Sequence, residues 1–102
     1  MSHSPWFTVA DRVASRACQT LSSRMSSRTQ PIALSLELGG RFSHTVMTWR
    51  VDPQAPELAL ELTRSTIRSS LQFQPLPFDG AVVVRADGAV LCTVQARVGR
   101  RG

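Results

Sequence analysis

The chain has 102 residues, of which 42% are hydrophobic, a size and composition that suit one small domain with a modest core. Its net charge of +5 rests on arginine alone, because lysine is absent together with asparagine and tyrosine, and we attribute this bias to a GC-rich coding sequence. No apolar run approaches the ~18 residues of a membrane-spanning helix, and two cysteines are too few for a disulfide framework and lack zinc spacing.

The first predicted element is a helix over residues 8–25. Thr8 and Asp11 have the spacing of a capping box, in which the threonine hydroxyl would accept from a free backbone N–H and the Asp11 carboxylate would reach back to the N–H of Thr8. The apolar stripe expected at helical spacing comprises Trp6, Ala10, Val13, Ala17 and Leu21. The arginine- and serine-rich start, poor in acids, also fits an organelle targeting segment, whereas Asp11 and the cap favour a structural helix.

A β-hairpin is predicted next. Its first strand alternates apolar and smaller or polar residues, the pattern of a half-buried strand, with Ile32, Leu34, Leu36 and Leu38 on the apolar side. Gly39-Gly40 supplies a tight turn. The chain then returns over residues 42–51, and the expected shared face comprises Thr45, Met47, Trp49 and Val51.

Residues 53–73 allow two interpretations. As a helix, the segment aligns Leu60, Ile67 and Leu71 and accepts Pro56 in its first turn, but Leu58 and Leu62 fall on the opposite side. As a strand, residues 57–62 alternate cleanly. We favour the helix because the segment is long and rich in good helix formers.

The last predicted element is a hairpin whose strands, residues 81–85 and 89–94, flank the turn signal Asp87-Gly88. Symmetric pairing across that turn would put Val83 opposite Cys92 and Val84 opposite Leu91, so that both faces would be largely apolar. We therefore expect the hairpin to be well covered or to meet a partner.

Together these elements predict a single α+β domain, in the order helix–hairpin–helix–hairpin, with an antiparallel sheet packed by two helices. The domain is expected to span residues 8–98, between an N-terminal tail (residues 1–7) and a basic C-terminal tail (residues 99–102).

The sequence offers no constellation for catalysis or metal binding. Of two histidines, His44 lies alone on the mixed face of a strand. Cys18 and Cys92 lie in apolar company and are interpreted as buried free thiols, with a disulfide between them as the alternative in an oxidising compartment. Glu57 and Glu61 sit one helical turn apart, which favours a solvated helix face over paired acid/base chemistry. We expect a non-enzymatic protein with no catalytic residue, no metal site and no cofactor.

The succession of motifs resembles the C-terminal domain of the TonB/TolA family of envelope energy transducers. The similarity covers about residues 8–85 and consists of the Gly39-Gly40 hairpin, a proline-introduced helix from Pro56 to Leu71, the exit Phe73-Gln74-Pro75 and the pair Asp79-Gly80. Residues 80–102 are also similar, over a shorter stretch, to the surface-presentation domains of flagellar and type III secretion rings.

The resemblance implies a protein-interaction module of a bacterial envelope or secretion machine, which recognises an extended partner segment by adding it to a sheet edge. A periplasmic location would follow; without the resemblance, the absence of a secretory signal favours the cytoplasm. The strand expected to receive the partner covers residues 90–98, and the partner-binding candidates are Arg85, Val90, Cys92, Val94 and Arg97.

Two further partners remain open from the sequence. The chain could pair with a second copy of itself through a sheet edge. Alternatively, it could be a small nucleic-acid-associated protein, because its positive charge concentrates at residues 1–30 and 97–101.

Overall fold

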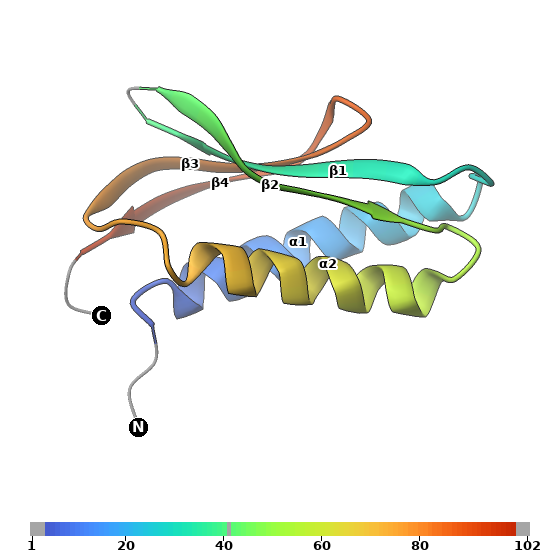
Figure 1. Cartoon of the computed structure of the whole chain (residues 1–102), viewed down its shortest axis with the longest axis horizontal. Coiled ribbons are helices and arrows are strands. Elements are labelled where there is room, and N and C mark those ends of the chain that lie inside the picture. Colours follow the sequence, from blue (N-terminus) through green and yellow to red (C-terminus); the bar gives the residue numbers. More distant parts are fainter. Residues whose placement is uncertain (1–3, 41, 100–102) are drawn as a thin grey trace.

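The computed structural model describes residues 4–40 and 42–99. Its elements follow in the order α1 (Phe7–Met25), β1 (Ile32–Gly39), β2 (Ser43–Val51), α2 (Pro56–Leu71), β3 (Phe78–Ala86) and β4 (Ala89–Val98) (Figure 1). The predicted α+β class and the order helix–hairpin–helix–hairpin are confirmed. The helical interpretation of residues 53–73 is also confirmed, with Pro56 in the first turn of α2. No helix in the described ranges is both long and apolar enough to cross a membrane.

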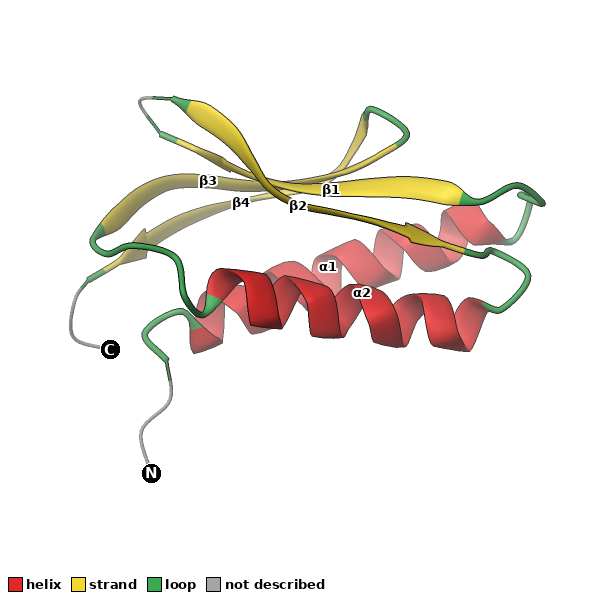
Figure 2. Cartoon of the chain, viewed as in Figure 1, coloured by secondary structure: helices red, strands yellow, loops and turns green. Residues whose placement is uncertain are grey.

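The four strands form one antiparallel sheet in the order β2-β1-β3-β4. The two central strands carry fully buried side chains, among them Leu36, Val82 and Val84. β2 and β3 are separated by β1, so α2 connects them by crossing one face of the sheet. Figure 2 shows both helices on that face and the tips of both hairpins curving away from it. Neither helix of residues 4–40 and 42–99 covers the opposite face.

The core lies between the sheet and the helices. α1 packs beneath β4 and β3, α2 packs beneath β2, and the helices contact each other. The predicted apolar stripe of α1 is buried throughout. Trp6 is fully buried, and its Nε1 donates to the carbonyl of Gln74 at 3.1 Å. The packed part of the chain therefore begins before residue 8. Residues 1–3 and 100–102 of the expected tails lie outside the described residues.

The predicted cap of α1 is wrong. The helix begins at Phe7, and its first residues receive no side-chain cap from Thr8. Instead, the Ser4 hydroxyl accepts from the backbone N–H of Trp6 at 3.2 Å. Because the helix starts one residue early, Thr8 already lies inside the first turn, and Asp11 is free to pair with Arg68 of α2.

The shared face predicted for the second strand is only partly right. A β-bulge shifts the pairing of β1 with β2 between Leu36 and Glu37. Met47 therefore pairs with Leu36 on the helix side, whereas Thr45 pairs with Glu37 on the other side. An extra residue in one strand changes which side the following side chains face, since successive side chains alternate.

The predicted turn of the last hairpin is confirmed, since Asp87 and Gly88 both have positive φ angles, 50° and 86°. The turn predicted at Gly39-Gly40 of the first hairpin is wrong in detail, because neither glycine has the positive φ angle of a tight two-residue turn. The predicted register of the last hairpin is wrong beyond its turn. A second bulge lets Val84 pair with Cys92 in place of Leu91. The helix side of this hairpin is apolar, but the side away from the helices is not, so the expectation of two apolar faces also fails.

Candidate functional site

The reactive side chains of the described chain do not converge. Across residues 4–40 and 42–99, no three His, Cys, Asp or Glu residues are grouped so as to hold a metal ion. His44 is exposed on β2, where it pairs with Leu38. Glu57 and Glu61 are exposed on α2. Since acid/base and nucleophilic chemistry need a nucleophile held beside a base, these positions offer no starting point for a reaction.

Both cysteines are free thiols; Cys18 is buried as predicted, whereas Cys92 is only half-buried. The Cys18 Sγ lies 3.5 Å from the carbonyl oxygen of Leu60, and the Cys92 Sγ lies 4.0 Å from that of Val13. Burial raises the pKa of both thiols, and nearby arginines only partly offset this effect. Because the thiolate is the nucleophilic form, both cysteines are weak nucleophiles at neutral pH.

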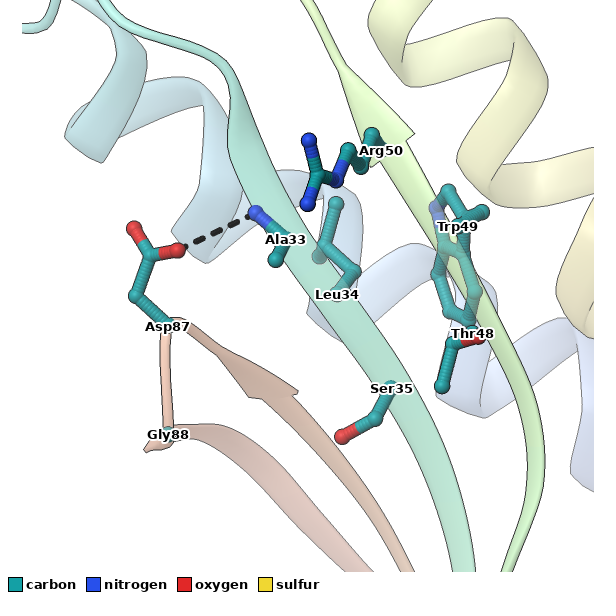
Figure 3. A pocket seen from close by; sticks show the side chains of 8 residues that line it. All are labelled: Ala33, Leu34, Ser35, Thr48, Trp49, Arg50, Asp87 and Gly88. Carbon is teal, nitrogen blue, oxygen red and sulfur yellow. Dashed lines mark hydrogen bonds between the residues drawn. The ribbon is translucent and has the colours of Figure 1, made fainter.

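A shallow depression lies on the uncovered face, where the β3–β4 turn approaches β1 and β2 (Figure 3). Asp87 spans this approach: its Oδ1 accepts from the Ala33 N–H at 3.1 Å, and its Oδ2 accepts from Arg28. The hydrogen bond from Arg28, with that from Ala33, lowers the pKa of Asp87. The Asp87 carboxylate thus adds a hydrogen bond between β1 and the β3–β4 turn just beyond the last β1–β3 pair, Leu34 and Ala86. Its role is therefore structural.

The uncovered face of the sheet is polar and close to neutral. Two of its arginines form cross-strand ion pairs, Arg85 with Glu37 at 3.1 Å and Arg97 with Asp79 at 3.2 Å. Other outward positions hold Ser35, Thr48, Thr93 and Gln95, with Val83 and Val90 as apolar side chains among them. Within the described strands, no aromatic side chain takes an outward position on this face. Stacking of nucleic-acid bases on the sheet would require such rings.

The five residues predicted to bind a partner do not form one patch. Arg85 lies on β3 and pairs with Val90 of β4, and both belong to the uncovered face. Cys92 and Val94 turn toward the helices, where Val94 is buried. Arg97 is exposed and is engaged by Asp79. The other four lie on β4, which is nevertheless an edge of the sheet, so its backbone is available in principle.

One contact partly occupies the β4 edge. Arg16 of α1 donates from Nη1 to the carbonyl oxygen of Thr93 at 3.4 Å. A guanidinium that engages the backbone of an edge strand competes with an incoming strand for the same carbonyl, a protective arrangement that natural sheets use at their edges.

The opposite edge, β2, was not considered in the sequence analysis. From Ser43 to Trp49 it contains no arginine, aspartate or glutamate, and its residues there are exposed or half-buried. Threonine, valine and tryptophan favour strands. The run of β formers without charge was visible in the sequence, but only the strand order reveals that this strand lies at an edge.

Comparison with known proteins gives no match to a family model, to a curated protein or to a solved structure. The resemblance to the TonB/TolA C-terminal domain therefore rests on the sequence motifs alone.

Proposed function

We propose that this chain is a non-enzymatic protein-interaction module, which binds an extended segment of another protein by adding it as a strand to an edge of its sheet. The observation that carries the proposal is the strand order, which leaves β2 and β4 paired on one side only. The unpaired N–H and C=O groups of an edge strand give affinity, and alternate side-chain contacts give specificity.

The resemblance to the TonB/TolA C-terminal domain supports the same mode of binding. It also supports a role in a bacterial envelope or secretion machine and, with it, a periplasmic location. On this proposal Val90 and Arg97 would flank a partner added to β4, with Arg97 exchanging Asp79 for an acid on the partner.

Selection from a displayed random-peptide library against the full chain tests the proposal. Peptides that bind should slow hydrogen exchange of backbone amides in one edge strand, because strand addition turns solvent-exposed N–H groups into ladder hydrogen bonds. Affinity should fall with salt far less steeply than phosphate contacts would make it fall, because main-chain hydrogen bonds supply most of it. Peptides that bind without protecting either β2 or β4 would contradict strand addition.

Nucleic-acid binding is the second candidate, and one observation favours it. Within the described residues, five arginines form no ion pair: Arg12, Arg16, Arg24, Arg50 and Arg64. They lie on α1, α2 and β2, so they do not build the single basic stripe that a nucleic-acid interface usually presents. Their dispersal is why we rank this function second.

The salt dependence of binding separates the two functions. Phosphate contacts release counterions, so affinity for a labelled DNA or RNA duplex should fall steeply with salt if the second candidate is right. Fluorescence anisotropy at several salt concentrations measures that slope, and no binding at low salt removes this candidate.

A further inference from the structure

The β2 edge has an exposed apolar neighbour on α2. Leu58 and Leu62, which we call the α2 flank, are 68% and 46% exposed. They lie four residues apart and so share one side of the helix. Met47, on the helix side of β2 at its free edge, is 42% exposed. Exposed apolar side chains that gather on one side of a molecule commonly mark a binding surface.

The α2 flank lies on the same side of the molecule as the β2 edge. The side of α2 that faces α1 is marked by Leu60, whose carbonyl oxygen meets the Cys18 Sγ, and by Arg68, which pairs with α1. Leu58 and Leu62 each lie two residues from Leu60, more than half a helical turn away. They therefore point away from α1.

The positions of the two helices under the sheet show which sheet edge lies on the side of α2 that points away from α1. α2 packs beneath β2, where Thr63 Oγ1 accepts from Trp49 Nε1 at 3.1 Å, and α1 packs beneath β4 and β3. The side of α2 turned away from α1 is consequently the side on which the sheet ends with β2 (Figure 1).

The stretch of chain that leads into α2 and forms its first half is acidic although the chain as a whole is basic, and Arg50 and Arg64 flank it. Residues 52–62 contain Asp52, Glu57 and Glu61 and no arginine, in a chain of net charge +5. Glu61 lines a shallow depression with Leu58 and Leu62, and Glu57 lines a neighbouring one with Leu58. In the described part of the chain neither glutamate forms an ion pair, although Glu61 also borders a depression lined by Arg64 and Arg68.

We propose that the β2 edge and the α2 flank together bind an extended segment of a partner polypeptide in which apolar residues alternate with arginine or lysine. This inference rests on the proposed function and names its strand and its partner chemistry. The partner backbone pairs with β2. Every second side chain of the added strand then lies on the helix side, over Leu58 and Leu62, because side chains alternate across a strand. Basic side chains near these positions meet Glu57 and Glu61.

The charge argues for a different chain over a second copy of this one. In a symmetric β2–β2 pair the added strand would be β2 itself, which from Ser43 to Trp49 carries no arginine to meet Glu57 and Glu61. A basic segment meets the same surface with attraction.

Peptide selection against the full chain tests the inference. The displayed random-peptide library should yield sequences in which apolar residues alternate with arginine or lysine, and these peptides should protect β2 amides from hydrogen exchange. Leu58→Ser and Leu62→Ser should each weaken binding of the selected peptide by about tenfold, the loss expected for an apolar anchor. Phe73→Ser is the matched control, since Phe73 is 81% exposed just beyond α2 and lies outside the surface.

Charge variants make a second test. The double variant Glu57→Gln, Glu61→Gln should bind the basic peptide more weakly and with less dependence on salt. Asp79→Asn, on β3, should change neither the affinity nor its salt dependence. Circular dichroism confirms that each variant folds; all these side chains are exposed, so the substitutions leave the core intact.

The outcomes separate this inference from the function on which it rests. Protection of β4 in place of β2, or selection of acidic peptides, overturns the inference and leaves strand addition standing. Binding that protects neither edge, or no enrichment at all, overturns both. A β2-protected dimer of the chain in sedimentation experiments, without peptide, overturns the choice of partner.

Discussion

Gly80→Ala is the substitution for which the structure gives the sharpest prediction. Gly80 lies in β3 where the β1–β2 hairpin passes close by. A Cβ atom at this position would lie 2.0 Å from the carbonyl oxygen of Gly39 and 3.1 Å from the Cα of Gly40. Real Cβ atoms essentially never come closer than 3.0 Å to a heavy atom, and the atoms met here belong to backbone, which cannot rotate aside.

The expected cost follows from that distance. The end of β1 would have to move by about 1 Å, which disturbs its pairing with β2 and β3 together. Overpacking of this kind costs ~1–3 kcal/mol, and we expect the upper end because backbone must move. At ~4–8 °C per kcal/mol for a domain of this size, Tm should fall by roughly 12–24 °C.

Thermal and urea unfolding followed by circular dichroism measure the effect. Gly40→Ala is the control, because its Cβ would lie 3.4 Å from the nearest atom, the Asp79 carbonyl oxygen, an ordinary contact. Gly88→Ala is a second control, with nothing within 4 Å but a φ of +86°, so it should lose only the ~1–2 kcal/mol of a left-handed backbone. A Gly80→Ala protein as stable as Gly40→Ala would refute the close approach of the two hairpins.

Three further predictions concern buried or paired side chains. Thr63→Val should lower the free energy of unfolding by ~1–3 kcal/mol in urea titrations, because it leaves the Trp49 Nε1–H without its partner. Asp87→Asn should lower the urea midpoint at neutral pH, because the folded-state pKa of Asp87 is lowered and its ionised form therefore stabilises the fold above the unfolded-state pKa. The difference in urea midpoint between the variant and the wild type should disappear as the pH falls to about 2. Cys18 and Cys92, whose pKa values burial raises, should react with a thiol reagent at pH about 8 only after denaturant is added; rapid reaction of the native chain would contradict their burial.

Much of the fold could be predicted from local patterns. The alternation from Ile32 to Leu38 and the turn signal at Asp87-Gly88 depend only on neighbouring residues, and both led to the correct elements. The helical α2 was predicted despite Leu58 and Leu62, which spoil its apolar face. These two leucines are exposed, so the irregularity in the pattern identified a surface and did not indicate a strand.

The errors arose where a distant contact or an inserted residue decides the geometry. Asp11 was expected to reach back to Thr8, but Arg68 of α2 offers it an ion pair. The register after Asp87-Gly88 was expected to be symmetric, and the bulge near Leu91 breaks it. Neither the ion pair between Asp11 and Arg68 nor the bulge can be inferred from neighbouring residues in the sequence, because both depend on packing between elements.

For the candidate site, the sequence by itself determined three features: strands of good β formers, an apolar pair on the side of α2 opposite its other leucines, and a locally acidic stretch in a basic chain. Only the tertiary structure decided that β2 and β4 are the edges, that Arg16 engages β4, and that Leu58 and Leu62 stand beside β2. The physical reason is that periodicity reports the environment of each side chain along its own element, whereas the strand order depends on pairing between β1 and β3, whose residues lie some fifty positions apart.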